Sequence, residues 1–164
     1  MGFEDKILSR EINHILYEQH KTLATAESCT GGGVAQAIIS IPGSSMYFKG
    51  GVVAYTNEVK MKLLNVPAEL IEKHTAVSEE VAIAMVKGAI DALDTDYAVS
   101  VTGTAGPGGG TADIPVGTIW LACGSKDDIR TMKLTEDFGR DINLAIATSK
   151  VLQMLLELVQ EDNK

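Results

Sequence analysis

The chain has 164 residues, of which 45% are apolar, and this length suits one globular domain spanning residues 1–164. Acidic side chains number 22 and basic ones 14, and the net charge of −8 disfavours nucleic acid and anionic membranes as partners. Only two cysteines occur, no basic and apolar leader opens the chain, and no apolar run approaches the roughly 20 residues that cross a bilayer. We therefore expect a soluble cytoplasmic protein that binds neither nucleic acid nor membrane.

Helical and strand patterns alternate along the chain, and turn residues separate them. In chain order they predict a helix over 4–18, a strand over 22–26, a helix over 34–41, a strand over 46–56 with a bend at Gly50 and Gly51, a helix over 57–66, a short helix from Pro67, a helix capped by Ser78 that ends near Asp94, a strand over 96–103, a hairpin of 116–124 with 128–135, and a helix over 140–160. Strand-helix units followed by a hairpin predict a three-layer α/β/α sandwich, whose mixed, mostly parallel sheet ends in an antiparallel edge hairpin.

Three glycine-dense segments follow predicted strands or interrupt them, at residues 31–33, 50–51 and 103–110. In an open α/β sheet, ligands bind in the crevice outside the carboxyl ends of the strands. We therefore expect two or more of these segments to line one pocket.

The first glycine segment belongs to the stretch "AESCTGGG" at 26–33, which leads into a helix. Unpaired amides at a helix N-terminus attract phosphate, carboxylate or a developing oxyanion, and Thr30, Gly31 and Gly32 would supply them. The alternative is that Ser28 or Thr30 only caps the helix while the glycines permit close packing. The stretch matches neither the phosphate-binding loop of nucleoside triphosphatases nor the dinucleotide fingerprint.

The third glycine-dense segment belongs to the stretch "VTGTAGPGGGTADIPVG" at 101–117, which begins where a predicted strand ends. Thr102 closes that strand, and Gly103 and Gly106 are among five glycines that let backbone amides approach an anion closely. A mobile connection is the alternative, although long loops in compact domains are more often functional or disordered.

A hydrolase would need a nucleophile and a base, and Ser28 and Cys29 are adjacent candidates for the first role. None of the three histidines is an obvious base for Ser28, because residues in their positions more often lie on the surface or pack in the core. Lys60 follows a strand end and could act as a base if burial lowers its pKa, with Lys62 as its rival, although most lysines are solvated surface charges. Cys29 more often has a packing role, because an unpaired cysteine behaves as a small apolar group.

The remaining polar residues give weaker signals. Two cysteines without paired spacing and three scattered histidines predict no metal site, and nothing in the sequence indicates a cofactor. Arg140 stands between Asp137 and Asp141 before the last predicted helix. It could bind a phosphate or carboxylate with two parallel hydrogen bonds, or it could pair with a neighbouring acid, which is commoner.

Taken together, these stretches resemble the CinA C-terminal domain family, the competence/damage-inducible CinA-like proteins that include bacterial nicotinamide mononucleotide deamidases. The resemblance rests on five motifs in order, which cover nearly the whole chain: "AESCTGGG" at 26–33, "PGSS" at 42–45, "GGVVAYTNEVKMKLLNV" at 50–66, "AVSEEVAIAM" at 76–85 and "VTGTAGPGGGTADIPVGTIW" at 101–120.

The resemblance implies a metal-independent amidohydrolase that converts nicotinamide mononucleotide to nicotinate mononucleotide and ammonia, in a domain that assembles into homo-oligomers. By motif, Ser28 matches the family's nucleophile, Lys60 its general base and Tyr55 a supporting hydroxyl. Thr102 matches the active-site threonine of the T-G-x-A-G-P loop, and Arg140 the arginine before the final helix.

Two positions depart from the family's pattern. Ile114 stands where relatives commonly carry lysine before Pro-Val-Gly, and Asn143 stands where a further basic residue is frequent. Weaker or rearranged phosphate binding is the expected effect, and a ligand-binding or regulatory module without turnover is the alternative function. Many family members carry an N-terminal domain of another fold, and we expect this chain to be the stand-alone form.

Overall fold

The computed structural model describes residues 2–164. Within them the elements are, in chain order, α1 (Phe3–Gln19), β1 (Leu23–Glu27), α2 (Gly33–Ile39), the 3₁₀ turn η1 (Ser44–Met46), β2 (Phe48–Val53), α3 (Asn57–Leu64), α4 (Ala68–His74), α5 (Glu79–Leu93), β3 (Tyr97–Gly103), β4 (Ile119–Gly124), β5 (Ile129–Leu134) and α6 (Arg140–Asp162). Every predicted helix and strand is found. The turn η1 was not indicated by the sequence pattern.

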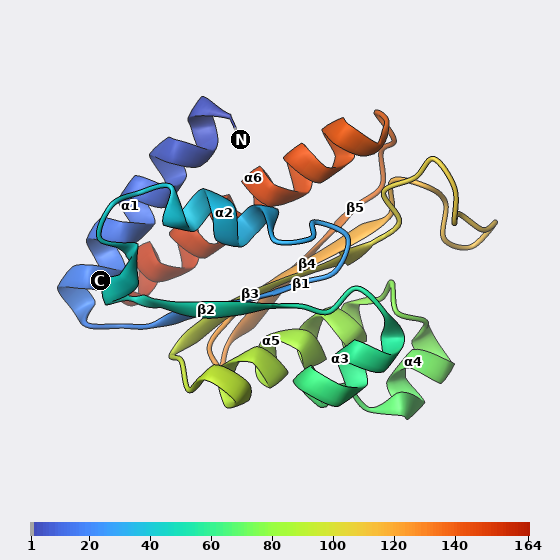
Figure 1. Ribbon diagram of the computed structural model, residues 1–164, viewed down its shortest axis with the longest axis horizontal. Helices are drawn as coiled ribbons and strands as arrows, with labels where there is room; N and C mark the ends of the chain where they lie inside the picture. The colour runs from blue at the N-terminus through green and yellow to red at the C-terminus, as the bar shows by residue number, and fades with distance from the viewer. Residues whose placement is uncertain (1) are drawn as a thin grey trace.

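The five strands form one sheet in the order β2-β1-β3-β4-β5. Strand β1 runs parallel to β2 and β3, whereas β4 is antiparallel to both β3 and β5. Helices α1, α2 and α6 cover one face, and α3, α4 and α5 cover the other (Figure 1). The predicted three-layer α/β fold with a mixed sheet and an edge hairpin is confirmed. Two of the four strand pairings are parallel and two are antiparallel, so the sheet is evenly mixed where a mostly parallel one was predicted.

Two apolar clusters form the core, one on each face of the sheet. The larger cluster joins the sheet to α1 and α6, and the smaller one joins it to α5. Strands β1 and β3 are buried on both faces, which explains their nearly continuous runs of small and apolar residues. Burying one large apolar side chain stabilises the fold by about 1.5–3 kcal/mol, so the central strands are firmly held.

The ends of the parallel strands β1, β2 and β3 lie at the same edge of the sheet. Glu27, the last residue of β1, is in register with Val53 of β2 and Val101 of β3. The segments that follow these strands therefore leave the sheet side by side. The connection from β3 to β4 extends beyond the body of the domain (Figure 1). This edge of the sheet is where the crevice rule places a ligand.

Strands β1 and β2 pair closely and with one irregularity. Leu23 faces Phe48 while the next residue, Ala24, faces Gly50, so Lys49 is an extra residue on β2. The bend that we predicted near these glycines is this bulge. At Gly51 a Cβ atom would lie 2.1 Å from Oγ1 of Thr25, so the close approach of the two strands requires glycine.

Helix α6 is more apolar than the sequence pattern suggested. Within residues 2–164 it alone has the length and hydropathy that could cross a membrane. Its buried residues, among them Val151 and Leu155, instead belong to the core cluster that it shares with α1 and the sheet. These are the contacts of a core helix in a folded domain.

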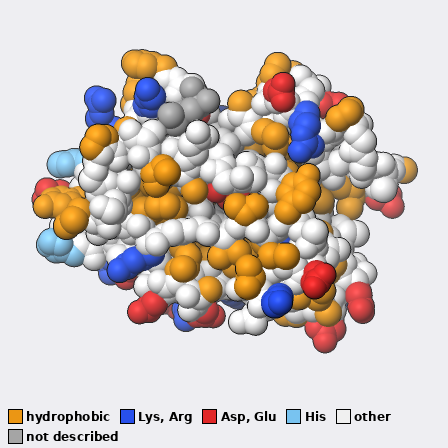
Figure 2. Space-filling view, viewed as in Figure 1, with side chains coloured by type: hydrophobic (Ala, Val, Ile, Leu, Met, Phe, Trp, Pro, Cys, Tyr) orange, Lys and Arg blue, Asp and Glu red, His pale blue; other side chains and the backbone are white. Residues whose placement is uncertain are grey.

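The open edge of the sheet at β2 carries exposed apolar side chains. Figure 2, in the orientation of Figure 1, shows hydrophobic side chains across the middle of this face, where β2 lies in front. Large apolar residues more than a third exposed in α2, η1, β2, α3 and the segment between β2 and α3 are Ile39, Met46, Val53, Tyr55, Met61 and Leu63. Such a surface is typical of one that contacts another molecule. Self-association stays a prediction.

Candidate active site

The side chains of Ser28 and Lys60 meet beneath the crevice. Ser28 directly follows β1, and Lys60 lies in the first turn of α3. The Nζ atom of Lys60 is 2.9 Å from Oγ of Ser28, which is hydrogen-bond distance. Both side chains are buried, and only 2% of Lys60 is exposed. A hydroxyl next to a buried amine is the arrangement that an activated nucleophile needs.

Helix α3 holds Lys60 in this position. Thr56 caps the helix by accepting a hydrogen bond from the amide of Val59. Helical side chains lean towards the N-terminus of their helix, so Lys60 reaches back over the first turn. Its amine donates to the carbonyl of Ala54 at 3.0 Å and makes a longer contact of 3.5 Å with the carbonyl of Tyr55. Two main-chain oxygens thus fix the amine beside Ser28.

Burial controls the protonation of Lys60. Removal from water lowers the pKa of the lysine, and the nearby Cys29 opposes this effect more weakly. Lys60 makes no ion pair with a carboxylate among residues 2–164. The neutral amine is therefore easier to reach here than on the protein surface.

A second buried charge, Glu27, lies next to Ser28 and was not singled out from the sequence. Its side chain is 1% exposed. Its carboxylate accepts hydrogen bonds from the hydroxyl of Thr30 at 2.7 Å, the amide of Val34 at 2.8 Å and the amide of Ala35 at 3.1 Å. Glu27 therefore caps α2 from outside the helix, in the position that the helix dipole favours for an anion.

This cap corrects the expectation that the N-terminus of α2 binds an anionic ligand. The amides of Val34 and Ala35 and the hydroxyl of Thr30 are already bonded to Glu27, and the amide of Gly33 donates to the carbonyl of Thr30. The amide of Gly31 donates to the carbonyl of Ser28, so it is also used. Thr30, Gly31 and Gly32 lie outside the cavity that Ser28 lines. The sequence could have suggested the cap, because a carboxylate just before a helix start is a common partner of that helix.

Cys29 is buried beside Ser28. Burial raises the pKa of its thiol to about 11, and the neighbouring Lys60 and Arg140 only partly oppose this. Near neutral pH the thiol is therefore protonated and a poor nucleophile. No carbonyl or carboxylate oxygen within residues 2–164 accepts the amide N–H of Cys29.

A cavity of about 290 Å³ opens above Ser28 at the sheet edge. Its volume is at the lower end of the range for small-molecule sites. Its lining residues come from the segments after β1, β2 and β3 and from the start of α6: Ser28, Cys29, Tyr55, Gly103, Thr104, Ala105, Gly106, Gly108, Gly109 and Arg140. Two or more of the three glycine-dense segments were expected to share a pocket. Only the third lines this one, and the other walls come from Cys29, Tyr55 and Arg140.

Arg140, the first residue of α6, is the cationic side chain of this cavity. One of its terminal nitrogens donates to the carbonyl of Gly106 at 2.9 Å. It forms no ion pair within residues 2–164, so neither Asp137 nor Asp141 neutralises it. The commoner alternative weighed from the sequence is therefore wrong. The remaining donors of the guanidinium are available to a carboxylate or phosphate.

Asn143 holds the glycine-rich loop to α6 and is only 3% exposed. Its amide nitrogen donates to the carbonyl of Ala105 at 3.1 Å and to the carboxylate of Asp137 at 2.9 Å. Its oxygen accepts from the amide of Phe138 at 2.9 Å. Asn143 thus joins three segments. At this position the chain has a structural clamp, and a basic side chain here would lose the hydrogen bond from Phe138.

Two other predicted residues occupy different positions around the pair. Tyr55 lines the cavity at its mouth and is 61% exposed. Thr102 is buried, and its hydroxyl donates to the carbonyl of Ala76 at 2.8 Å. Thr102 therefore ties the end of β3 to the segment before α5, and it does not line the cavity.

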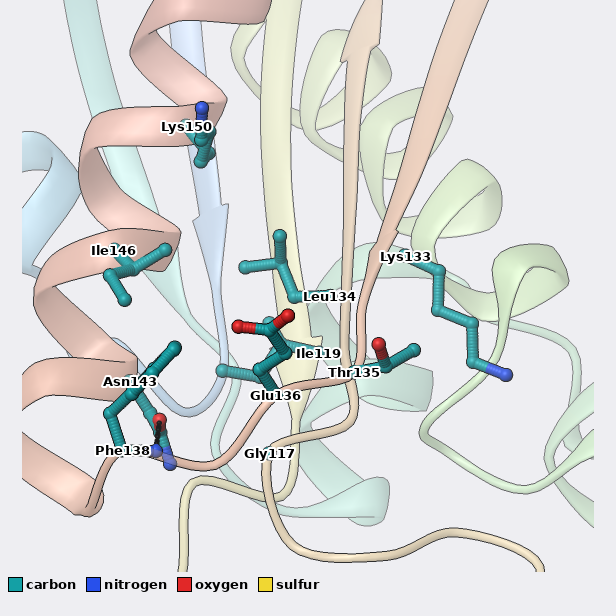
Figure 3. Close-up of a pocket in the computed structure, with 10 residues that line it drawn as sticks. All are labelled: Gly117, Ile119, Lys133, Leu134, Thr135, Glu136, Phe138, Asn143, Ile146 and Lys150. Carbon is teal, nitrogen blue, oxygen red and sulfur yellow. Dashed lines mark hydrogen bonds between the residues drawn. The ribbon is translucent and has the colours of Figure 1, made fainter.

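A larger cavity of about 350 Å³ lies on the other side of Asn143, between the β4–β5 hairpin and α6. Figure 3 shows the Glu136 carboxylate inside it, Phe138 and Asn143 at one end, and Lys133 pointing away. Its lining includes no serine or cysteine. No group of three or more histidine, cysteine, aspartate or glutamate side chains in residues 2–164 could hold a metal ion. The pair of Ser28 and Lys60 is thus the best-defined chemical site.

Comparison with known proteins supports these observations. A model of the CinA C-terminal domain matches residues 5–159. A CinA-like protein of Parasynechococcus marenigrum is 50% identical over 126 residues, which cover 77% of this chain and 30% of that protein. A CinA-like protein of Cytophaga hutchinsonii is 39% identical over 160 residues, covering 98% of this chain and 38% of that protein. The chain thus spans about a third of the length of these relatives.

Solved structures agree over almost the whole chain. The competence/damage inducible protein CihA from Agrobacterium tumefaciens superposes with a TM-score of 0.93 at 35% identity, and 96% of each chain is covered. A CinA superfamily protein from Escherichia coli gives a TM-score of 0.90 at 34% identity, with 96% of this chain and 94% of that one covered.

Proposed function

The chain belongs to the CinA C-terminal domain family, and from this membership together with the site geometry we propose that it is an amidohydrolase acting on nicotinamide mononucleotide. The products are nicotinate mononucleotide and ammonia. The observation that carries the proposal is the 2.9 Å contact between Oγ of Ser28 and the buried Nζ of Lys60.

The first half of the reaction begins with Lys60 in its neutral form. The two N–H groups of a neutral amine donate to the carbonyls of Ala54 and Tyr55, which leaves its lone pair for the hydroxyl of Ser28. Lys60 takes the hydroxyl proton as the serine oxygen bonds to the carboxamide carbon. It then gives this proton to the amide nitrogen as the carbon–nitrogen bond breaks. Ammonia leaves and an acyl ester on Ser28 remains.

In the second half, water hydrolyses the ester. Lys60 accepts a proton from the water as its oxygen bonds to the acyl carbon, and returns that proton to the serine oxygen as the ester bond breaks. Because Glu27 occupies the start of α2, the amide of Cys29 is the first candidate to stabilise the oxyanion. Losing one such donor costs about 3–4 kcal/mol in serine hydrolases. Arg140 and the amides of the glycine-rich loop are the candidates for the phosphate.

The test is ammonia release from nicotinamide mononucleotide by the intact protein, with Ser28→Ala and Lys60→Ala assayed in parallel. We expect release by the unaltered protein and its loss in both variants. Lys62→Ala is the matched control, because Lys62 lies two residues further along the same helix, is exposed, and is not the lysine that is bonded to Ser28. Release that persists in Lys60→Ala and disappears in Lys62→Ala would transfer the base role.

A ligand-binding module without turnover is the second candidate function. It is favoured by the small number of cationic side chains at the cavity: Arg140 is the one cationic lining residue, so few charged groups are there to hold a phosphate in the position that turnover needs. Ile114 lies in the loop and does not line the cavity, and Asn143 is engaged as a clamp. Saturable binding of nicotinamide mononucleotide without ammonia release would support this function.

A further inference from the structure

We propose that Glu27 is a positioning residue, whose buried carboxylate fixes the turn that directs Ser28 towards Lys60. The inference rests on the proposed function, because positioning matters for catalysis only if Ser28 reacts. Its structural part concerns the distance between two atoms and can be tested without any substrate.

The first argument is how the carboxylate is held. Glu27 forms no ion pair with a lysine or arginine among residues 2–164. Its charge is balanced by the hydroxyl of Thr30, by the amides of Val34 and Ala35, and by the positive end of α2. Thr30 lies within the turn that contains Ser28, and Val34 and Ala35 lie beyond it in α2. The carboxylate therefore bridges the end of β1 and the start of α2, and the turn between them has little freedom.

The second argument is a main-chain link from Glu27 to the base. The carbonyl of Glu27 accepts the amide of Ala54 at 2.8 Å, and the carbonyl of Ala54 accepts the amine of Lys60 at 3.0 Å. Glu27 thus contacts the segment that holds the lysine as well as the turn that holds the serine. A shift of this residue changes the geometry of the pair from both sides.

A neutral side chain of the same size separates positioning from bulk. Glu27→Gln keeps the shape, but its NH₂ group cannot accept from either helix amide and would face one of them. We expect the turn to move until the conflict is relieved. A misplacement of about 1 Å at a catalytic group can cost roughly 10²-fold in rate.

The protein supplies a matched control at the other end of β1. The carboxylate of Asp96 accepts the amide of Thr22 at 2.8 Å and its hydroxyl at 3.0 Å, and it also pairs with Lys21 at 3.5 Å, so it anchors the start of β1 without a hydrogen bond to Ser28 or Lys60. Asp96→Asn should lower thermal stability as Glu27→Gln does. It should leave the active site unchanged.

The kinetic experiment measures kcat and KM for nicotinamide mononucleotide together with the thermal midpoint of each variant. We expect kcat to fall about 10²-fold in Glu27→Gln, with KM within about threefold, and kcat in Asp96→Asn to stay within about twofold. Equal values of kcat for the two variants, per amount of folded protein, would show that Glu27 has a structural role only.

A crystal structure of Glu27→Gln decides the inference independently of turnover. We expect the distance between Oγ of Ser28 and Nζ of Lys60 to exceed hydrogen-bond range. A distance that stays at 2.9 Å would refute the positioning role. If the unaltered protein releases no ammonia, the proposed function fails, and this distance still decides whether Glu27 positions Ser28.

Discussion

Lys60 and Ser28 stand 32 positions apart in the chain, and their side chains form a buried hydrogen bond of 2.9 Å. Ser28 directly follows the central strand β1, whereas Lys60 lies on the helix that follows the edge strand β2. The pairing of β1 with β2 therefore brings them together. Because both positions belong to firmly packed elements, the contact is a property of the fold and does not depend on a mobile loop.

The choice between serine and its neighbour cysteine as nucleophile can be tested directly. Ser28→Ala should reduce kcat for ammonia release by about 10³-fold or more, because it removes the attacking atom. Cys29→Ala should keep kcat within a few-fold, since the pKa of this thiol is raised to about 11 and no thiolate forms near pH 7. Activity that survives the first change and is lost in the second would assign the reaction to cysteine.

The pH dependence of the reaction should report the neutral form of Lys60. Burial lowers the pKa of this lysine, so the active base forms at a pH below the value of roughly 10.4 for a solvated lysine. On the acidic side we expect kcat/KM to rise about tenfold per pH unit. The plateau should begin at a pH lower than the pKa of a solvated lysine. A rate that falls between pH 6 and pH 8 would contradict a lysine base.

The same shift predicts a pH-dependent stability. Since the pKa of Lys60 is lower in the folded protein than in the unfolded chain, the unfolded chain binds more protons between these two values. The free energy of unfolding contributed by this group therefore rises with pH in that window, and below the folded pKa the cost of the buried charge is complete. Lys60→Met lacks this slope.

Urea unfolding of both proteins from pH 6 to pH 10 measures the difference. The difference between their free energies of unfolding changes with pH only through Lys60, because the other groups titrate in both proteins. Met leaves the carbonyl of Ala54 without its partner, a cost of about 1–3 kcal/mol that does not vary with pH. Parallel stability curves would mean that the pKa of Lys60 is the same in both states.

The clamp at Asn143 gives a prediction on loop position. Asn143→Asp replaces the donor by a carboxylate facing Asp137 and the carbonyl of Ala105, and we expect a loss of about 1–3 kcal/mol in unfolding free energy. Because the loop lines the cavity, KM should also increase. Asp141→Asn, two residues away and exposed, is the control: it should leave KM unchanged and lower the unfolding free energy by at most about 1 kcal/mol, because Asp141 lies in the first turn of α6. An unaffected KM would show that the loop does not need this anchor.

The fold could be read from the sequence because its signals are local and strong. The central strands are short apolar runs, and the helices carry clear apolar stripes between glycine, proline and capping residues such as Ser78. The turn η1 was missed because three residues have no periodicity to detect. The hydropathy of α6 was underestimated because polar residues interrupt its apolar stripe.

The site was only partly readable, for a physical reason. Ser28 and Lys60 were found from their positions after strand ends and from the motifs. The cap by Glu27 depends on the direction of its side chain, which is set only once α2 has formed. From the sequence, Asn143 was interpreted as the loss of a basic residue that is frequent in the family. Its hydrogen bonds to residues 105, 137 and 138 exist only in the folded chain. Hydrogen bonds to carbonyls such as that of Ala54 leave no mark in the sequence.

The extra residue Lys49 sets the register of β2 against β1 for the rest of the strand. The bulge adds one residue to β2 before the strand continues to Val53 and Ala54, and the carbonyl of Ala54 is the one that anchors the base. Removing Lys49 would draw the following segment back by one position and turn alternate side chains to the opposite face. The number of residues at the start of the edge strand β2 thus sets how the Nζ atom of Lys60 is aligned with Oγ of Ser28 at its other end.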